Sequence, residues 1–166
     1  MKTIPYTLFI VAAAAITCVA IAAEKEEEAG GAASAAKVFE PANLAWGDAP
    51  PGLPAGAQLA VLSGDPTKKG VFTVRLRMPA GYKIPPHIHP TAELVTVISG
   101  SIHLGTGGKF DETAGQKMEV GSFSAIPAGV KHFAWTTEES VIQIHGEGPF
   151  GIKHVDPADD PRTSKK

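Results

Sequence analysis

The sequence predicts an all-β domain, built as a sandwich or a barrel of many short strands. Helical periodicity is missing from the middle of the chain, where short runs rich in β-branched and aromatic residues recur instead. Segments dense in glycine, proline, aspartate and lysine, such as "SGDPTKKG" and "GEGPFG", separate these runs. With 166 residues, the chain is long enough for one domain with a hydrophobic core.

Eight runs are the expected strands, and in chain order they cover residues 58–63, 71–78, 93–99, 101–104, 123–126, 132–136, 141–145 and 151–155. In the second run, Arg75 and Arg77 share one face, which we expect to point outward, although an arginine at a barrel mouth could also clamp a substrate carboxylate. In the fourth run, Ile102 and Leu104 are expected to face the core, which leaves His103 on the surface.

The N-terminal residues 1–22 read as a signal peptide. Lys2 precedes a nearly uncharged apolar run, an acidic cluster follows it, and Ala20 and Ala22 suit cleavage after Ala22. The alternative is an uncleaved membrane anchor, because the run approaches the ~20 residues that a bilayer-spanning helix needs. We expect an exported protein, periplasmic or secreted.

Composition divides the rest of the chain into three parts. Residues 23–37 contain charge, glycine, alanine and serine with almost nothing to bury, and are predicted to form a flexible linker. The folded domain is expected over residues 38–155. Residues 156–166 form a polar C-terminal tail that prolines interrupt.

Charge and cysteine usage exclude several classes of function. The formal net charge is −2, and acidic and basic residues are spread along the chain, so no basic face indicates a nucleic acid or an anionic membrane as a partner. A small neutral or anionic molecule fits at least as well. The membrane remains a partner only if the N-terminal segment is retained. Cys18 is the one cysteine and lies in the predicted signal peptide, so a metal site in the mature protein must use nitrogen and oxygen ligands.

The stretch "GYKIPPHIHPTAELVTVISG" contains the first candidate ligands. In a strand, His87 and His89 point to the same face with Cα atoms about 6.6 Å apart. A straight strand would carry Glu93 roughly 13 Å further along, so the chain must turn at Pro90 to bring Glu93 back to the same interior. Such a set suits iron(II), manganese, zinc, nickel or copper. The alternative for this stretch alone is a proline-rich turn that happens to carry two histidines.

A second stretch, "GSFSAIPAGVKHFAWT", supplies another histidine. Its Pro-Ala-Gly turn delivers His132 at the start of an apolar strand, and Phe133 and Trp135 are expected to pack on the opposite face of that strand. Together the two stretches resemble the double motif of the cupin proteins, G-x5-H-x-H-x3,4-E-x6-G and G-x5-P-x-G-x2-H-x3-N. The matching residues are Gly81, His87, His89, Glu93 and Gly100 in the first motif, and Gly121, Pro127, Gly129 and His132 in the second.

The resemblance to the cupins implies a jelly-roll β-barrel, a double-stranded β-helix in a single domain, with His87, His89, Glu93 and His132 as the ligands of one divalent transition metal. Three imidazoles and a carboxylate would leave one or two coordination positions open, and an open nitrogen and carboxylate site makes Fe(II) the preferred metal. The departure from the motif is Thr136, where the family usually has an asparagine that is not a ligand.

Three further residues are candidate catalytic groups. The run "VIQIH" alternates, so Gln143 and His145 share one face, which either looks into the barrel toward substrate or outward into solvent. Tyr82 could donate a hydrogen bond near the metal or pack under the prolines. His154 lies near the polar tail and is expected on the surface.

Two functions remain open at the level of sequence. The first is a metal-dependent enzyme, dioxygenase-like, that acts on a small oxygenated organic molecule. The second is a non-catalytic metal-containing module that binds or senses a small ligand. Cupins with these ligands include oxygenases, decarboxylases and isomerases, so the ligands do not define the reaction. The oligomeric state does not follow from the sequence, although cupins commonly form homodimers through their sheets.

Overall fold

The computed structural model describes residues 35–163. The predicted signal peptide, most of the predicted linker and the last three residues of the predicted tail lie outside this range. The folded part belongs to one compact unit, Val38–Lys166. Among the described residues, no helix has the length and apolar character needed to cross a bilayer.

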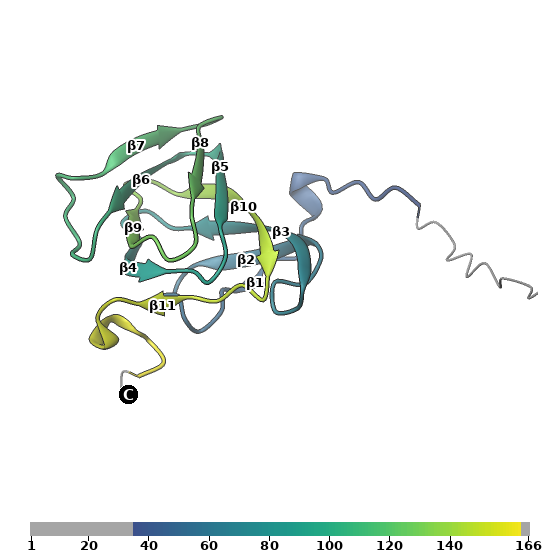
Figure 1. The fold of residues 1–166 in the computed structure, drawn as a ribbon. Helices are drawn as coiled ribbons and strands as arrows, with labels where there is room; N and C mark the ends of the chain where they lie inside the picture. The colour runs from purple at the N-terminus through teal and green to yellow at the C-terminus, as the bar shows by residue number, and fades with distance from the viewer. Residues whose placement is uncertain (1–34, 164–166) are drawn as a thin grey trace, which may run out of the picture. The chain divides into compact units, whose positions relative to one another are not determined.

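Two antiparallel sheets form the domain, which confirms the all-β prediction, and Figure 1 shows how their strands surround a common interior. The first sheet has the order β1-β2-β3-β10-β5-β8, with β1 Gly47–Asp48, β2 Gln58–Ser63, β3 Gly70–Met78, β10 Ser140–Gly148, β5 Glu93–Ser99 and β8 Phe123–Ile126. The second has the order β11-β4-β9-β6-β7, with β11 Lys153–His154, β4 Lys83–Ile88, β9 His132–Trp135, β6 Ser101–Thr106 and β7 Gln116–Glu119. Short 3-10 turns lie at η1 Pro41–Asn43 and η2 Pro157–Asp159.

Each of the eight expected strands is present, and β1 and β7 were not expected. β4 was outside the eight runs, although the ligand argument placed His87 in a strand. The omission of β4 has a physical cause, because Pro85 and Pro86 cannot donate to a sheet ladder. The structure accommodates them with a shift of register between Ile84 and His87 in the pairing of β4 with β9. Pro86 still contributes its carbonyl oxygen, which accepts a hydrogen bond of 2.8 Å from the amide of Val155.

Aliphatic side chains from both sheets fill the interior, as alternation along the strands requires. On β3, Val74 and Leu76 are buried and Arg75 lies on the other face, where its Nε donates to Gln143 at 3.1 Å. Arg77 also lies on that outer face, with its guanidinium 4.0 Å from the ring centre of Trp46. The outward expectation for the two arginines is therefore confirmed.

The aromatic residues of β9 are buried, as expected, and they also cover a histidine. Phe133 has no exposed surface and Trp135 is 5% exposed. His103 on β6 stacks on Trp135, with ring centres 4.7 Å apart and planes 9° apart. The expectation of a surface position for His103 needs correction, because its side chain is partly buried and one face of its ring stacks on the indole.

Candidate metal centre

Three buried imidazoles meet at one end of the barrel. His87 in β4 and His132 in β9 are direct partners in the sheet register, and their ring centres are 4.1 Å apart. His89 follows β4, with ring centres 4.9 Å from His87 and 5.4 Å from His132. One nitrogen from each ring lies within 4.8 Å of the others, so the three side chains could hold a metal ion.

Backbone carbonyls orient all three rings. The Nδ1 atoms of His87, His89 and His132 lie 2.7, 2.7 and 2.9 Å from the carbonyl oxygens of Pro85, Gly151 and Val130. A carbonyl oxygen can only accept, so each Nδ1 carries a proton, and in the neutral form of the ring Nε2 then presents a lone pair. Metal-binding histidines commonly show this arrangement, in which the second nitrogen donates to the protein and orients the ring.

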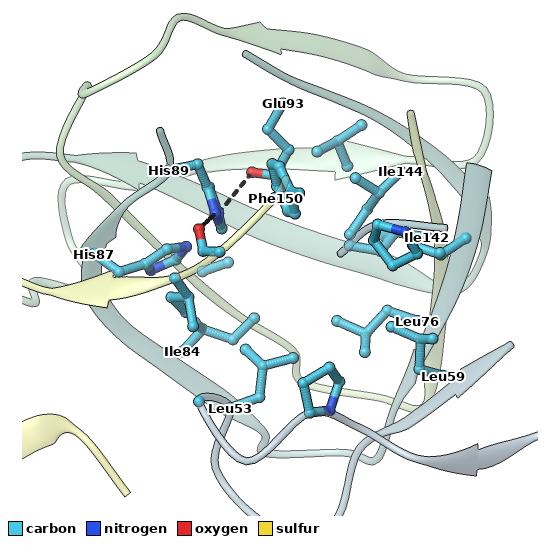
Figure 2. A pocket seen from close by; sticks show the side chains of 18 of the residues that line it. Leu53, Leu59, Leu76, Ile84, His87, His89, Glu93, Ile142, Ile144 and Phe150 are labelled. Atoms are coloured by element: carbon cyan, nitrogen blue, oxygen red, sulfur yellow. Dashed lines mark hydrogen bonds and ion pairs between the residues drawn. The ribbon is translucent and has the colours of Figure 1, made fainter. Parts of the chain in front are cut away.

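Glu93 completes the cluster and makes the case for a cation. Its Oε2 lies 3.2 Å from Nε2 of His132 and 3.6 Å from Nε2 of His89, and the side chain is buried. Figure 2 shows Glu93 beside His89. Both Nε2 atoms are buried without a hydrogen-bond partner. A carboxylate and an imidazole lone pair are both acceptors, so the contact is favourable when a proton or a metal ion lies between them. The donor set fits a divalent transition metal.

The electrostatic environment favours the neutral form of two of the imidazoles, His87 and His89. Burial, reinforced by the neighbouring His132, lowers the pKa of His87 to about 2. Burial also lowers the pKa of His89, even though the carboxylate of Glu93 acts in the opposite direction. A neutral imidazole is the form that ligates a metal.

The chain turns between β4 and β5, as the distance argument predicted, and this turn brings Glu93 to the histidines. β4 ends at Ile88 and β5 begins at Glu93. The amide of Gly129 donates to the carbonyl of His89 at 2.9 Å, so the turn that leads to His132 also holds the His89 segment. Gly129 has a φ of 75°, a left-handed conformation that favours glycine.

The C-terminal part of the domain contributes residues that the sequence did not reveal. Phe150 stacks on His89, with ring centres 4.2 Å and planes 15° apart, and it packs on Phe72 at 5.0 Å. His154 is buried, so the surface expectation was wrong. It pairs with His87 across β11 and β4, and its Nε2 donates to the carbonyl of Gly52 at 2.8 Å. The sequence predicted a strand at 151–155, but nothing in it indicated that this strand pairs with β4.

A cavity of about 310 Å³ extends from the cluster through the barrel. His87, His89, Glu93 and His132 line one end, and aliphatic side chains form most of the remaining wall. Five lining residues are solvent-exposed and mark the mouth: Pro50, Pro51, Thr67, Gly151 and Arg162. The loops that carry them therefore form the opening.

The structure places the other candidates away from this cavity. Ile142 and Ile144 line it, and Gln143 and His145 occupy the opposite face of β10. There, Nε2 of Gln143 and Nε2 of His145 are 3.0 Å apart, and Nδ1 of His145 is 3.0 Å from Oγ1 of Thr73. The sequence left both directions open, and the structure selects the outward one.

Tyr82 and Thr136 have local structural roles. The hydroxyl of Tyr82 donates to the carbonyl of Pro54, and burial raises the pKa of this side chain to about 12. Thr136 donates to the carbonyl of Pro79 at 2.6 Å and accepts from the amide of Tyr82 at 3.1 Å. Neither residue lines the cavity, so the threonine that replaces the usual asparagine stabilises a turn.

Comparison with solved structures places the fold. The polyketide cyclase RemF from Streptomyces resistomycificus is similar with a TM-score of 0.62 and 17% identity, over 76% of this chain and 89% of that one. A putative acetylacetone dioxygenase from Methylibium petroleiphilum gives 0.55 and 18%, over 76% and 88%. An RmlC-like cupin from Shewanella frigidimarina gives 0.52 and 14%, over 66% and 87%.

No curated protein resembles the sequence significantly. A family model described as a domain of unknown function, DUF4437, matches residues 37–163. The structural similarities, all of low identity, concern the fold and confirm the resemblance that the two histidine motifs indicated. The chain therefore belongs to the DUF4437 family, and its domain is a cupin-type jelly-roll barrel.

Proposed function

We propose that the protein is a mononuclear metal enzyme, dioxygenase-like, that acts on a small oxygenated organic molecule. His87, His89, Glu93 and His132 are the proposed ligands, and Fe(II) is the preferred metal. The observation that carries this proposal is the pair of buried, unpartnered Nε2 atoms beside a buried carboxylate. Three imidazoles and one carboxylate leave one or two positions of a five- or six-coordinate ion for ligands from the cavity.

A bound metal of this kind supplies Lewis-acid polarisation of substrate oxygens and, as iron, one-electron chemistry. The protein orients the metal ligands and lines the cavity with apolar side chains. Carbonyl acceptors hold the three rings at Nδ1, Phe150 covers one face of His89, and the aliphatic wall keeps water from the reacting end.

The lining of the cavity supports chemistry centred on the metal. Apart from the four proposed ligands, Arg162 at the mouth is the one titratable side chain among the lining residues. A reaction that needs a separate acid and base from the protein, such as a sugar isomerisation, lacks those groups here. The similarity to a putative acetylacetone dioxygenase agrees with an oxidative reaction, although it concerns the fold alone.

The lining of the cavity also favours a second candidate function. A cavity whose acid and base groups, apart from Arg162 at the mouth, are all proposed metal ligands suits a module that captures a small ligand on its metal and does not transform it. Redox turnover distinguishes this binding function from the enzyme.

The test measures metal content of the purified protein by mass spectrometry, and then oxygen uptake with a panel of small phenols, diketones and hydroxy acids. Stoichiometric iron with substrate-dependent oxygen uptake is the expected result, and bound zinc without turnover would favour the binding module. His132→Ala should abolish metal binding, with His145→Ala as the matched control on the outer face of the sheet. Unchanged metal content in His132→Ala would contradict the ligand assignment.

A further inference from the structure

We infer that the ligand of this cavity is amphipathic, with one oxygen-bearing head at the metal end and an apolar body along the aliphatic section. This inference rests on the proposed function, because the head is assigned to the proposed metal. It adds the chemistry of the rest of the molecule, which the metal ligands leave open.

Polar and apolar side chains are separated along the cavity. In Figure 2, His87, His89 and Glu93 gather on one side, and Leu59, Leu76 and Ile142 lie on the other. Leu53 and Ile84 line the wall between them, and strand backbone groups on the way are already paired in the sheets. A sugar or another polyol would bury hydroxyl groups without partners here, at a cost of roughly 1–3 kcal/mol for each group. An alkyl or aryl body incurs no such cost.

The one cation among the lining residues at the mouth is already paired with a carboxylate of the protein. Arg162 is the cation there, and its Nε and one terminal nitrogen each donate to the carboxylate of Asp160 at 2.7 Å. The same terminal nitrogen donates to the carbonyl of Ile152 at 3.1 Å. Three of the five N–H donors of this guanidinium, and its charge, are therefore already used within the protein. The pairing weakens its attraction for a second carboxylate on the ligand, which favours a single polar head at the metal end.

The volume limits the length of the body. At the ~30 Å³ that a water molecule occupies in the liquid, the cavity of about 310 Å³ has room for roughly ten non-hydrogen atoms. A two-oxygen head followed by about six to eight carbons fills this space.

The test uses linear alkyl hydroxamates, from acetohydroxamate to dodecanohydroxamate, titrated into the metal-loaded protein by calorimetry. The hydroxamate provides the same two-oxygen head throughout the series. We expect affinity to rise about fourfold for each added methylene group, and to stop rising near the eight-carbon member. Equal affinity across the series would overturn the inference.

A matched pair of variants on β2 locates the apolar section. Leu59 lines the cavity, and Val61 on the same strand is 48% exposed and does not line it. Leu59→Phe should move the optimum to shorter chains and weaken the eight-carbon member about tenfold, and Val61→Phe should leave the series unchanged. Thermal unfolding confirms that both variants fold, and equal behaviour of the two variants would argue against this path.

Separate results test the metal site and the apolar section of the cavity. Metal-dependent binding of acetohydroxamate without any gain from longer chains would leave the proposed function intact and overturn the amphipathic ligand. If acetohydroxamate shows no metal-dependent binding, the result contradicts the proposed function. It also contradicts the assignment of the ligand's polar head to the metal. Titration of metal-free protein with 1-hexanol and 1-octanol then decides the apolar section alone, since tighter binding of 1-octanol supports it and equal or absent binding overturns it.

Discussion

Replacing Glu93 with glutamine should have opposite effects on the metal-free and the metal-loaded protein. In the metal-free protein, the carboxylate lies 3.2 Å from the Nε2 lone pair of His132, and both groups are acceptors. The amide of Glu93→Gln can donate a hydrogen bond to that lone pair, which we expect to raise the free energy of unfolding by about 1 kcal/mol. For a unit of roughly 130 residues, this corresponds to an increase in Tm of about 4 °C.

The metal should act in the other direction. At a concentration of a hundred times its Kd, a bound metal adds about 2.7 kcal/mol to the stability of the native protein, or about 10 °C in Tm for a unit of this size. Glu93→Gln removes the charged oxygen ligand, so this increment should shrink. The assay is thermal unfolding followed by circular dichroism, after chelation and again with added metal, with Glu139→Gln as a control at an exposed carboxylate.

A large loss of stability in metal-free Glu93→Gln would refute this reasoning. If the cluster were instead a buried ion pair between an imidazolium and Glu93, removal of one charge would cost about 3–5 kcal/mol, and Tm would fall by roughly 10–20 °C. An imidazolium has no lone pair for a metal, so that result would also count against the metal centre.

Three more predictions concern separate features of the site. The unfolded chain takes up a proton on His87 near pH 6.5 and the folded chain does not, because burial lowers its pKa to about 2; chemical denaturation of metal-free protein should therefore show a stability about 2 kcal/mol lower at pH 5 than at pH 7.5, and a flat profile would contradict the shift. Phe150→Ala removes the ring stacked on His89 and should cost about 2–3 kcal/mol in denaturant unfolding and weaken metal binding in calorimetry; unchanged metal affinity would deny it a positioning role. Tyr82→Phe leaves the carbonyl of Pro54 without its donor, so thermal unfolding should show a loss of about 1–2 kcal/mol in stability, and metal affinity should not change. A loss of turnover without a loss of stability would instead assign Tyr82 a role in the reaction.

Local sequence patterns were sufficient to predict most of the strands and the proximity of the proposed metal ligands. The β-branched runs predicted eight strands, because alternation and turn residues act over a few positions. The distance between His89 and Glu93 required a turn, and the structure has one between β4 and β5. β4 itself was missed because its two prolines argue against a strand, and only the shifted pairing with β9 accommodates them.

Long-range pairing explains what the sequence could not predict. Alternation in β10 sorted Gln143 and His145 onto one face, but which face is interior depends on the other sheet. Phe150 and His154 reach the cluster because the chain after β10 returns to pair with β4. No local signal in the sequence specifies that pairing.

The direct pairing of His87 with His132 makes the cluster sensitive to strand register. A slip of one residue between β4 and β9 would turn the side chains of one strand to the other face of the sheet, and the two imidazoles would no longer meet. Their proximity thus depends on the shift of register between Ile84 and His87, because it separates the Ile84–Ala134 pair from the His87–His132 pair. After refolding, the fraction of molecules that bind metal would therefore measure the fraction in which β4 and β9 are paired in the native register.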